Sequence, residues 1–423
     1  MNNPPKQEGA AARRGLTLMM WMALATAFLG WMFDGMEMGL FSVAIRPALA
    51  ELTGKATPEE LSPYISMTVS LFLIGMACGG MLFGRLGDRL GRTKTLALTV
   101  LMYAVFTGLA ALSRNWPQLA ACRFLGALGL GGEWGLGVAL VMETWPNVSR
   151  PLLAGLLGSA ANFGFLASGL IGRLQAHYDW TWRIVLGFGF APGLLTFLIR
   201  LCVKEPERWV RSRERGESSA FADLFRPPLR RRTLVGAGLG AVSVLGMWGA
   251  YQTWIQAWVI DLVKPGDPKA AIATTTIACA LGSIVGAMLG GLIGGWLGRR
   301  RSFALLCVAT MAMMALLYLT CDTYGPRFLW LIALTGVPTT AFFGWLPLYL
   351  PELFPTRLRT TGEGFTFNVG RVVSGLGVFG TAGFVNLLDG SIPHASFVMS
   401  MVYLVGLGLI WLGPELKGTE LPD

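Results

Sequence analysis

The sequence has few charged residues for its length. Only 14% of its 423 residues are Asp, Glu, Lys or Arg, whereas 53% are hydrophobic. A soluble core could not bury so many apolar side chains, so this composition indicates an integral membrane protein. The sequence also lacks a nucleotide-binding loop, a metal-ligand cluster and a nucleophile constellation, and we therefore expect neither an enzyme nor a bound cofactor.

Histidine is scarce, and the cysteines have no paired spacing. The two histidines, His177 and His394, fall in predicted outer loops, so a proton that crosses the membrane would have to be carried by carboxylates. The six cysteines lie in or at the ends of apolar runs, which excludes a metal knuckle and argues against a disulfide framework. We therefore expect no metal site.

Long apolar runs are what the sequence does contain. A bilayer span needs about 20 mostly apolar residues, and twelve segments meet this requirement. The segments lie at 18–46, 63–84, 95–113, 117–142, 151–173, 181–203, 233–260, 270–297, 302–321, 328–350, 362–388 and 393–413. The sequence thus predicts an all-α integral membrane protein with twelve transmembrane helices.

The positions of Lys and Arg predict how these helices are oriented. If both termini and the even-numbered connections share one side, that side holds most of the 34 basic residues, which places it in the cytoplasm. The net charge of +10 then reflects the orientation of the helices in the membrane, and we expect no nucleic-acid partner. The basic cluster at 229–233 can touch anionic lipid headgroups. The first apolar run is too long for a cleavable signal peptide. We therefore expect a multi-pass protein of the cytoplasmic membrane.

Two motifs occur twice in the chain. The loop GRLGDRLGRTK (84–94) is repeated as GLIGGWLGRRR (291–301), and ETWPNVSRPLLAG (143–155) is repeated as ELFPTRLRTTGEG (352–364). Two repeated sites in matching order indicate a six-helix unit used twice, in parallel halves. The predicted parts are an N-terminal tail (1–17), a first half (18–203), a linker (204–232), a second half (233–413) and a C-terminal tail (414–423).

The repeated motifs also carry a family resemblance. GRLGDRLGRTK is similar to the signature loop of the major facilitator superfamily, and its second copy is degenerate. CRFLGALGLGGEWGLG (122–137), KEPERW (204–209), PELFPTRLRTTGEGFTFNVGR (351–371) and PELKGTEL (414–421) resemble the metabolite:proton and sialate/monocarboxylate:proton symporter branch. The resemblance implies a monomeric secondary transporter that moves a small organic metabolite, most simply an organic acid, together with protons. A sugar or polyol symporter, a drug efflux carrier and a transporter-like nutrient sensor remain alternatives.

The first copy of the loop has the residues expected of a gate. Its glycines let two helix ends approach closely, and its acid can accept hydrogen bonds from a neighbouring helix N-terminus or pair with an Arg. Gly295 replaces that acid in the second copy, where any latch must be steric. A simple positive-inside anchor is the alternative. The gating candidates are Gly84, Asp88, Arg89, Gly91 and Arg92.

Charges inside the predicted spans are the candidates for proton coupling. With a rise of 1.5 Å per residue, Asp34 lies about 21 Å from the inner edge and Arg123 about 9 Å from the outer edge of a core about 30 Å thick, so the two share one depth. In proton-coupled sugar porters, an acid in the first helix and an Arg in the fourth form such a pair. The resemblance therefore assigns proton coupling to Asp34 and Arg123, with Glu37 as the alternative acid, and a structural salt bridge is the other interpretation.

The substrate site is predicted from polar side chains inside the spans, and the resemblance implies that the seventh span, which carries Tyr251, Gln252 and Gln256, lines the cavity. Arg371 would lie near the midplane, where its planar guanidinium suits a carboxylate. Aromatic walls with a few amide and hydroxyl groups suit a small polar organic molecule. Arg371 can instead be structural, and the amides can simply join helices. The substrate-binding candidates are Arg371, Gln252, Gln256, Tyr251, Asn162 and Asn368.

Overall fold

The structure is a computed structural model of the whole chain, and it describes most of the predicted helical segments. The described backbone comprises residues 18–55, 57–145, 149–178, 180–190, 193, 197, 203–215, 220–265, 269–386 and 391–422. Within it, the side chains of 58, 59, 176, 253, 269 and 374–386 are not described.

The first half of the chain is a bundle of long helices, joined by short loops. Its helices are α2 (Leu18–Thr53), α3 (Pro58–Leu90), α4 (Arg92–Ala111), α5 (Trp116–Thr144), α6 (Arg150–Tyr178) and α7 (Trp182–Gly187). The helix α7 begins the predicted span 181–203, most of whose later residues lie outside the described part of the chain.

The second half repeats this arrangement after the linker, which contains α9 (Glu207–Glu214) and η2 (Phe221–Phe225). Its first span is interrupted by a π-helical turn, η3 (Gly246–Gln252), between α10 (Leu229–Leu245) and α11 (Thr253–Val263). The other elements are α12 (Lys269–Leu297), α13 (Arg299–Thr320), α14 (Pro326–Leu353), η4 (Thr356–Leu358), α15 (Arg359–Asn386), α16 (Ile392–Ser400), α17 (Val402–Leu409) and η5 (Ile410–Leu412).

The helices confirm the predicted fold class. Ten stretches of the described chain are long and apolar enough to cross a bilayer. The helix α15 coincides with the predicted span 362–388, and α7 starts the remaining one. The helix starts are specified locally. The Asn115 side chain accepts a hydrogen bond from the Gln118 backbone N–H (3.0 Å) at the start of α5, and Thr57 and Glu60 form a capping box at the start of α3.

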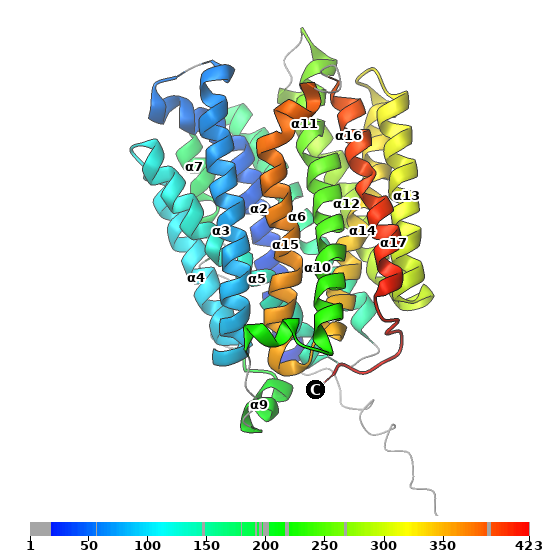
Figure 1. Cartoon of the computed structure of the whole chain (residues 1–423). Helices are drawn as coiled ribbons and strands as arrows, with labels where there is room; N and C mark the ends of the chain where they lie inside the picture. Colours follow the sequence, from blue (N-terminus) through cyan, green and yellow to red (C-terminus); the bar gives the residue numbers. More distant parts are fainter. Residues whose placement is uncertain are drawn as a thin grey trace, which may run out of the picture.

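The linker helix α9 and the C-terminus lie at the same end of the bundle, which we call the linker end (Figure 1). The repeated loops turn at this end through Gly91 and Gly298, whose φ angles of 114° and 90° favour glycine. Glycine also lets helices of opposite halves touch. A Cβ at Gly84 of α3 would lie 2.6 Å from the carbonyl oxygen of Thr360 of α15, and one at Gly155 of α6 would lie 2.6 Å from that of Met288 of α12.

Candidate functional site

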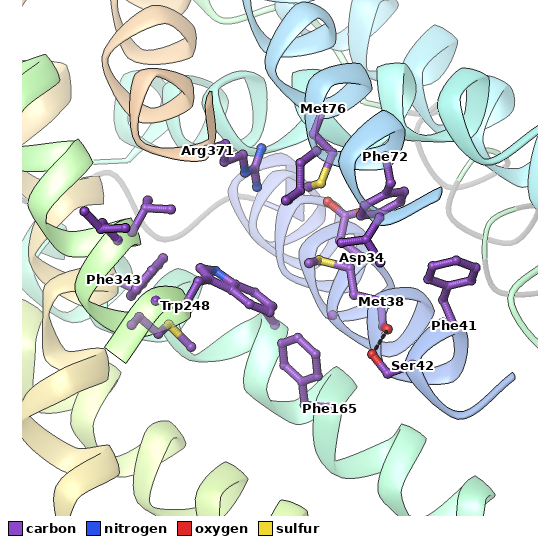
Figure 2. Close-up of a pocket in the computed structure, with 18 of the residues that line it drawn as sticks. Asp34, Met38, Phe41, Ser42, Phe72, Met76, Phe165, Trp248, Phe343 and Arg371 are labelled. Carbon is purple, nitrogen blue, oxygen red and sulfur yellow. Dashed lines mark hydrogen bonds between the residues drawn. The ribbon is translucent and has the colours of Figure 1, made fainter. Parts of the chain in front are cut away.

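A pocket of about 320 Å³ lies between the two halves. The helices α2, α3 and α6 line it from the first half, and α10, η3, α11, α14, α15 and α16 line it from the second. Figure 2 shows how Asp34, Phe165, Trp248 and Arg371 lie around it. Its wall is mostly apolar, and the aromatic rings in it belong to Trp31, Phe41, Phe72, Phe165, Trp248, Trp254, Phe343 and Phe367. The polar lining residues are few, namely Asp34, Ser42, Ser66, Asn162 and Arg371. Such a wall suits a small organic molecule with an apolar body and one strongly polar group.

Arg371 of α15 is the basic residue that lines this pocket. Its Nη1 donates a hydrogen bond to Oδ1 of Asn368, one turn earlier (3.0 Å), and its guanidinium lies 4.8 Å from the centroid of the Phe367 ring. Asp34 of α2 lies across the pocket and acts electrostatically on Arg371 (Figure 2). Asn368 and Phe367 thus hold a planar donor group at the pocket wall, opposite a carboxylate.

A second charged site lies in the interior of the first half, next to the pocket. Arg123 of α5 is ion-paired with Glu37 of α2 through both carboxylate oxygens, and both side chains are 2% exposed. The Thr107 hydroxyl donates to the same carboxylate (3.2 Å). The Arg123 guanidinium also lies over the rings of Phe41 and Phe72, at 3.8 and 4.5 Å. Arg123 is therefore held by one acid and two pocket aromatics.

This contact corrects the preferred assignment of the pair. We expected Asp34 to face Arg123, with Glu37 as the alternative, and in the structure Glu37 forms the ion pair. Three residues along a helix correspond to about 300° of rotation, so Glu37 lies nearly below Asp34 but is turned toward α5. Asp34 instead belongs to the pocket wall. The sequence therefore identified both acids, and the acid it gave as the alternative is the partner of Arg123.

The other predicted substrate residues divide into two groups. Asn162 lines the pocket, and Asn368 lies behind Arg371 and orients it. Three candidates on the second half lie outside the pocket lining, contrary to expectation. The buried Tyr251 donates to the carbonyl of Ile332 (2.6 Å), Gln252 accepts from the Cys279 thiol (3.9 Å), and Gln256 is exposed. The π-helical turn η3 changes the register of this segment and presents Trp248 to the pocket instead.

One aromatic contact between the halves was not predicted. The ring of Trp134 on α5 stacks on that of Phe367 on α15, with centroids 3.9 Å apart and planes inclined by 11°. Phe367 lies one turn closer to the linker end than Arg371, so this stack closes the pocket toward that end. Nothing in the sequence pairs these two rings, because the contact depends on how the halves are docked.

The predicted gate residue Asp88 joins the two halves at the linker end. Its carboxylate accepts hydrogen bonds from the backbone N–H groups of Thr360 and Thr361 (3.3 and 2.8 Å) and from the Thr361 hydroxyl (2.5 Å). These groups lie in the first turn of α15, where a negative charge is stabilised. The Thr360 hydroxyl donates to the carbonyl of Gly84 (2.7 Å), so that Gly84 takes part as well.

Arg92 extends this contact between the halves. It binds Asp88 (3.2 Å) and Glu143 (3.1 Å) and donates to the carbonyl of Thr356 in the second half (2.6 Å). Arg359 at the start of α15 reaches back to Glu143 (2.7 Å). We call the residues Asp88, Arg92, Glu143 and Arg359 the clasp. Its two carboxylates and two guanidinium groups are buried, and they span both halves.

The other two predicted gate residues lie at the edge of the clasp. Gly91 makes the turn before α4, where the carboxylate of Glu205 accepts from the N–H groups of Thr93 and Lys94 (3.1 and 3.2 Å). The Arg89 side chain is exposed, and its carbonyl accepts from Arg213 (3.0 Å). Gly91 therefore shapes the loop, and Arg89 lies beside the linker helix.

The second copy repeats the loop but not the clasp. Arg299 pairs with Glu352 within the second half (2.5 and 3.0 Å). Glu415 accepts hydrogen bonds from the backbone N–H groups of Arg299 and Arg300 at the start of α13 (2.8 and 3.0 Å). Glu205 has the same role at the start of α4. At the position of Asp88 stands Gly295, where a Cβ would lie 2.7 Å from the Pro151 ring. Proline has no N–H to donate, so this contact between α12 and α6 is steric.

Comparison with known proteins identifies the family. The model of the Major Facilitator Superfamily matches residues 20–378. The chain belongs to this superfamily of membrane transporters. It is 30% identical over 401 residues to a Cupriavidus pinatubonensis protein named "Probable 4-methylmuconolactone transporter", covering 93% of this chain and 90% of that protein. It is 27% identical over 395 residues to the "Cis,cis-muconate transport protein" of Acinetobacter baylyi, covering 91% and 92%.

The fold is also found among solved structures. The proton:xylose symporter XylE bound to 6-bromo-6-deoxy-D-glucose superposes with a TM-score of 0.78, at 16% sequence identity, covering 95% of this chain and 97% of that one. At this identity the likeness concerns the fold alone. Together, the family match and the relatives make the chain a transporter of small metabolites and not an enzyme.

Proposed function

We propose that this transporter moves a small organic acid across the cytoplasmic membrane by proton symport, as a single chain. The observation that carries the proposal is Arg371, a guanidinium held by Asn368 on the wall of an otherwise largely apolar pocket that is rich in aromatic rings. A planar guanidinium binds a carboxylate through two parallel hydrogen bonds, and the rings would contact the apolar body of the ligand. Asn162 is the amide that we expect to contact the same ligand.

The relatives support an organic acid over a sugar or polyol. One is named for the transport of muconate, which is a carboxylate. A sugar offers hydroxyl groups all around its ring and calls for many hydrogen-bonding partners, whereas the lining of this pocket has five polar residues. A drug efflux carrier would need the aromatic wall but not Arg371.

The opposed charges in the pocket suggest how a proton would be coupled. When the substrate carboxylate binds Arg371, it would replace Asp34 as the counter-charge of the guanidinium. A proton bound to Asp34 would remove the repulsion between the two acids, so that substrate and proton bind together. Glu37 and Arg123 form the second pair that a proton can break, and they connect to the pocket through Phe41 and Phe72.

The clasp would then act as the inner gate. We place the linker end in the cytoplasm, because the loops there hold most of the Lys and Arg. With the clasp formed and Trp134 stacked on Phe367, the pocket is closed on that side, which corresponds to an outward-facing state of an alternating-access cycle. Release of the substrate to the cytoplasm would require Asp88 to leave α15.

Transport by purified protein in proteoliposomes tests the proposal. An imposed pH gradient, acid outside, should drive accumulation of a labelled unsaturated or aromatic monocarboxylate or dicarboxylate, and adding the acid should move protons inward. The same panel should include sugars, polyols and amphipathic cations. Accumulation of a sugar would favour the sugar symporter, extrusion of a cation would favour efflux, and tight binding without flux would favour a sensor. Each of these outcomes contradicts the organic-acid proposal.

A further inference from the structure

A buried acid on α15 takes no part in the contacts described so far. Glu363 is 0% exposed, and neither of its carboxylate oxygens has a hydrogen-bond partner among the described residues. It lies one turn after Arg359 and one turn before Phe367, between the clasp and the aromatic stack. Its Cβ lies 3.5 Å from the place where a Cβ at Gly135 of α5 would stand, so it faces the first half.

Among the described residues, the charged groups that act most strongly on Glu363 belong to the clasp. They are Arg359 on its own helix, Glu143 on α5, Asp88 on α3 and Arg92 on α4. The helix α10 also packs on this part of α15 but meets it through Gly236 and Gly240, which contact Thr366. Glu363 therefore responds to two guanidinium groups and two other carboxylates.

The charge balance of this cluster determines the state of Glu363. Arg92 is bound to both Asp88 and Glu143, and Arg359 is bound to Glu143, so the two cations already have two counter-charges. Asp88 is further stabilised as an anion by the first turn of α15. A third carboxylate charge in this buried place would have no partner, which is very unfavourable inside a membrane protein. A protonated, neutral Glu363 leaves the cluster balanced.

We propose that Glu363 is a proton-binding site of the closed clasp. The carboxyl group keeps its proton while the two halves are joined at the linker end. When they part, water reaches Glu363, the O–H bond breaks, the proton passes to water, and a solvated carboxylate remains. The closed state binds the proton more tightly than the open state, so a low pH at the linker end stabilises the closed state and a high pH favours opening. This inference rests on the proposed alternating access, and not on the substrate or on the acid that couples transport.

Infrared spectroscopy tests whether the proton is there. In pH-difference spectra of the purified protein, the closed state should show a carboxyl C=O band that disappears in Glu363→Gln and remains in the control Glu214→Gln, on the exposed end of α9. Glu363→Leu should also fold and lack the band, because a neutral apolar side chain suits the same place. A band of unchanged intensity in both Glu363 variants would overturn the proposal, as would failure of both variants to fold, because an ionised, structural Glu363 predicts that failure.

Distance measurements test whether the proton controls opening. Spin labels at Lys94→Cys and Arg301→Cys, both exposed at the linker end of opposite halves, would report its width in a cysteine-replaced background. The parent should shift toward longer distances as the pH is raised, and Glu363→Gln should keep the short distance at every pH. A Glu363→Gln protein that opens with the parent's pH dependence would contradict the proposal. Neither readout needs a substrate, so the failure of the transport assay and the failure of this inference are separate results.

Discussion

Arg123 is bound to both carboxylate oxygens of Glu37 in the interior of the first half, with each side chain 2% exposed. The pair lies directly behind two aromatic residues of the pocket wall, Phe41 and Phe72, which cover the guanidinium. Asp34, one turn earlier on α2, faces Arg371 across the pocket. The two acids of α2 thus have different partners and should give different phenotypes when they are neutralised.

Glu37→Gln should destabilise the protein strongly. It leaves the buried charge of Arg123 without a counter-charge. Removing one partner of a buried ion pair lowers the free energy of unfolding by about 3–5 kcal/mol. The double variant Glu37→Gln with Arg123→Gln removes both charges and should recover part of that stability. Thermal unfolding of the detergent-purified variants, followed by size-exclusion chromatography, measures both. The single variant Arg123→Gln completes the cycle, and a double-variant loss equal to the sum of the two single losses would show that the pair contributes no coupling energy.

Asp34→Asn should affect coupling rather than folding. We expect it to abolish uphill accumulation driven by a pH gradient and to leave counterflow exchange of substrate, because exchange does not require the proton to be released. Both activities can be measured in the same proteoliposomes. Undiminished accumulation in both Asp34→Asn and Glu37→Gln would remove the acids of α2 from the coupling mechanism.

The sequence predicted the helices well, because the bilayer requires long apolar runs and α-helices satisfy their backbone groups internally. It also predicted that Asp88 contacts a helix N-terminus. The two repeated loops of the chain can be compared directly, and only the first has an acid at this position. The preference for Asp34 over Glu37 as the partner of Arg123 was wrong, because the argument from depth does not separate two acids that lie one turn apart.

Two features of the site could not be derived from the sequence. The directions in which Tyr251, Gln252 and Gln256 point depend on the π-helical turn η3. The sequence of that segment does not predict such a turn. The stack of Trp134 on Phe367 joins helices of different halves, so it depends on their relative position in this state of the transporter.

Arg371→Lys should lower the affinity for an organic acid even though it keeps the charge. The ammonium group cannot reproduce two parallel donors, and the loss of one charge-assisted hydrogen bond, about 1.5–3 kcal/mol, corresponds to tenfold or more in the dissociation constant. The constant should be measured on monodisperse Arg371→Lys and Arg371→Gln proteins, with Asn162→Ala as a milder change in the same pocket. Normal affinity in a well-folded Arg371→Gln protein would exclude direct contact with the substrate.

Glu415 should make the docking of the C-terminal tail depend on pH. Burial alone would raise the pKa of Glu415, but the N–H groups of Arg299, Arg300 and Lys417 outweigh it and lower the pKa. A lowered pKa stabilises the docked tail above the usual glutamate range, and this contribution is lost as the pH falls through the lowered value.

Glu415→Gln should therefore weaken tail docking by roughly 0.5–1 kcal/mol near neutral pH, the range for a helix cap whose charge water partly screens. Hydrogen exchange of the backbone over 414–422 measures this, with Glu420→Gln, an exposed neighbour, as the control. The variant should also lose the acid-induced rise in exchange that the parent shows. A rise of the same size in Glu415→Gln would assign the pH dependence to another group.

Asp88→Asn should open the clasp. The acid accepts three hydrogen bonds from the first turn of α15 and binds Arg92 (3.2 Å), whereas the amide has one acceptor oxygen and no charge. Loss of a charge-assisted bond worth about 1.5–3 kcal/mol shifts a two-state equilibrium by roughly ten- to 150-fold, so the inward-open population should rise and turnover should slow, with substrate affinity retained. Spin labels at Lys94→Cys and Arg301→Cys report the width of the linker end. Arg89→Gln is the matched control, because that exposed side chain neighbours the same loop and should leave the distances unchanged. If Asp88→Asn also leaves them unchanged, the loop is only a positive-inside anchor, and the closure at the linker end must come from the packing of the helices and from the Trp134–Phe367 stack.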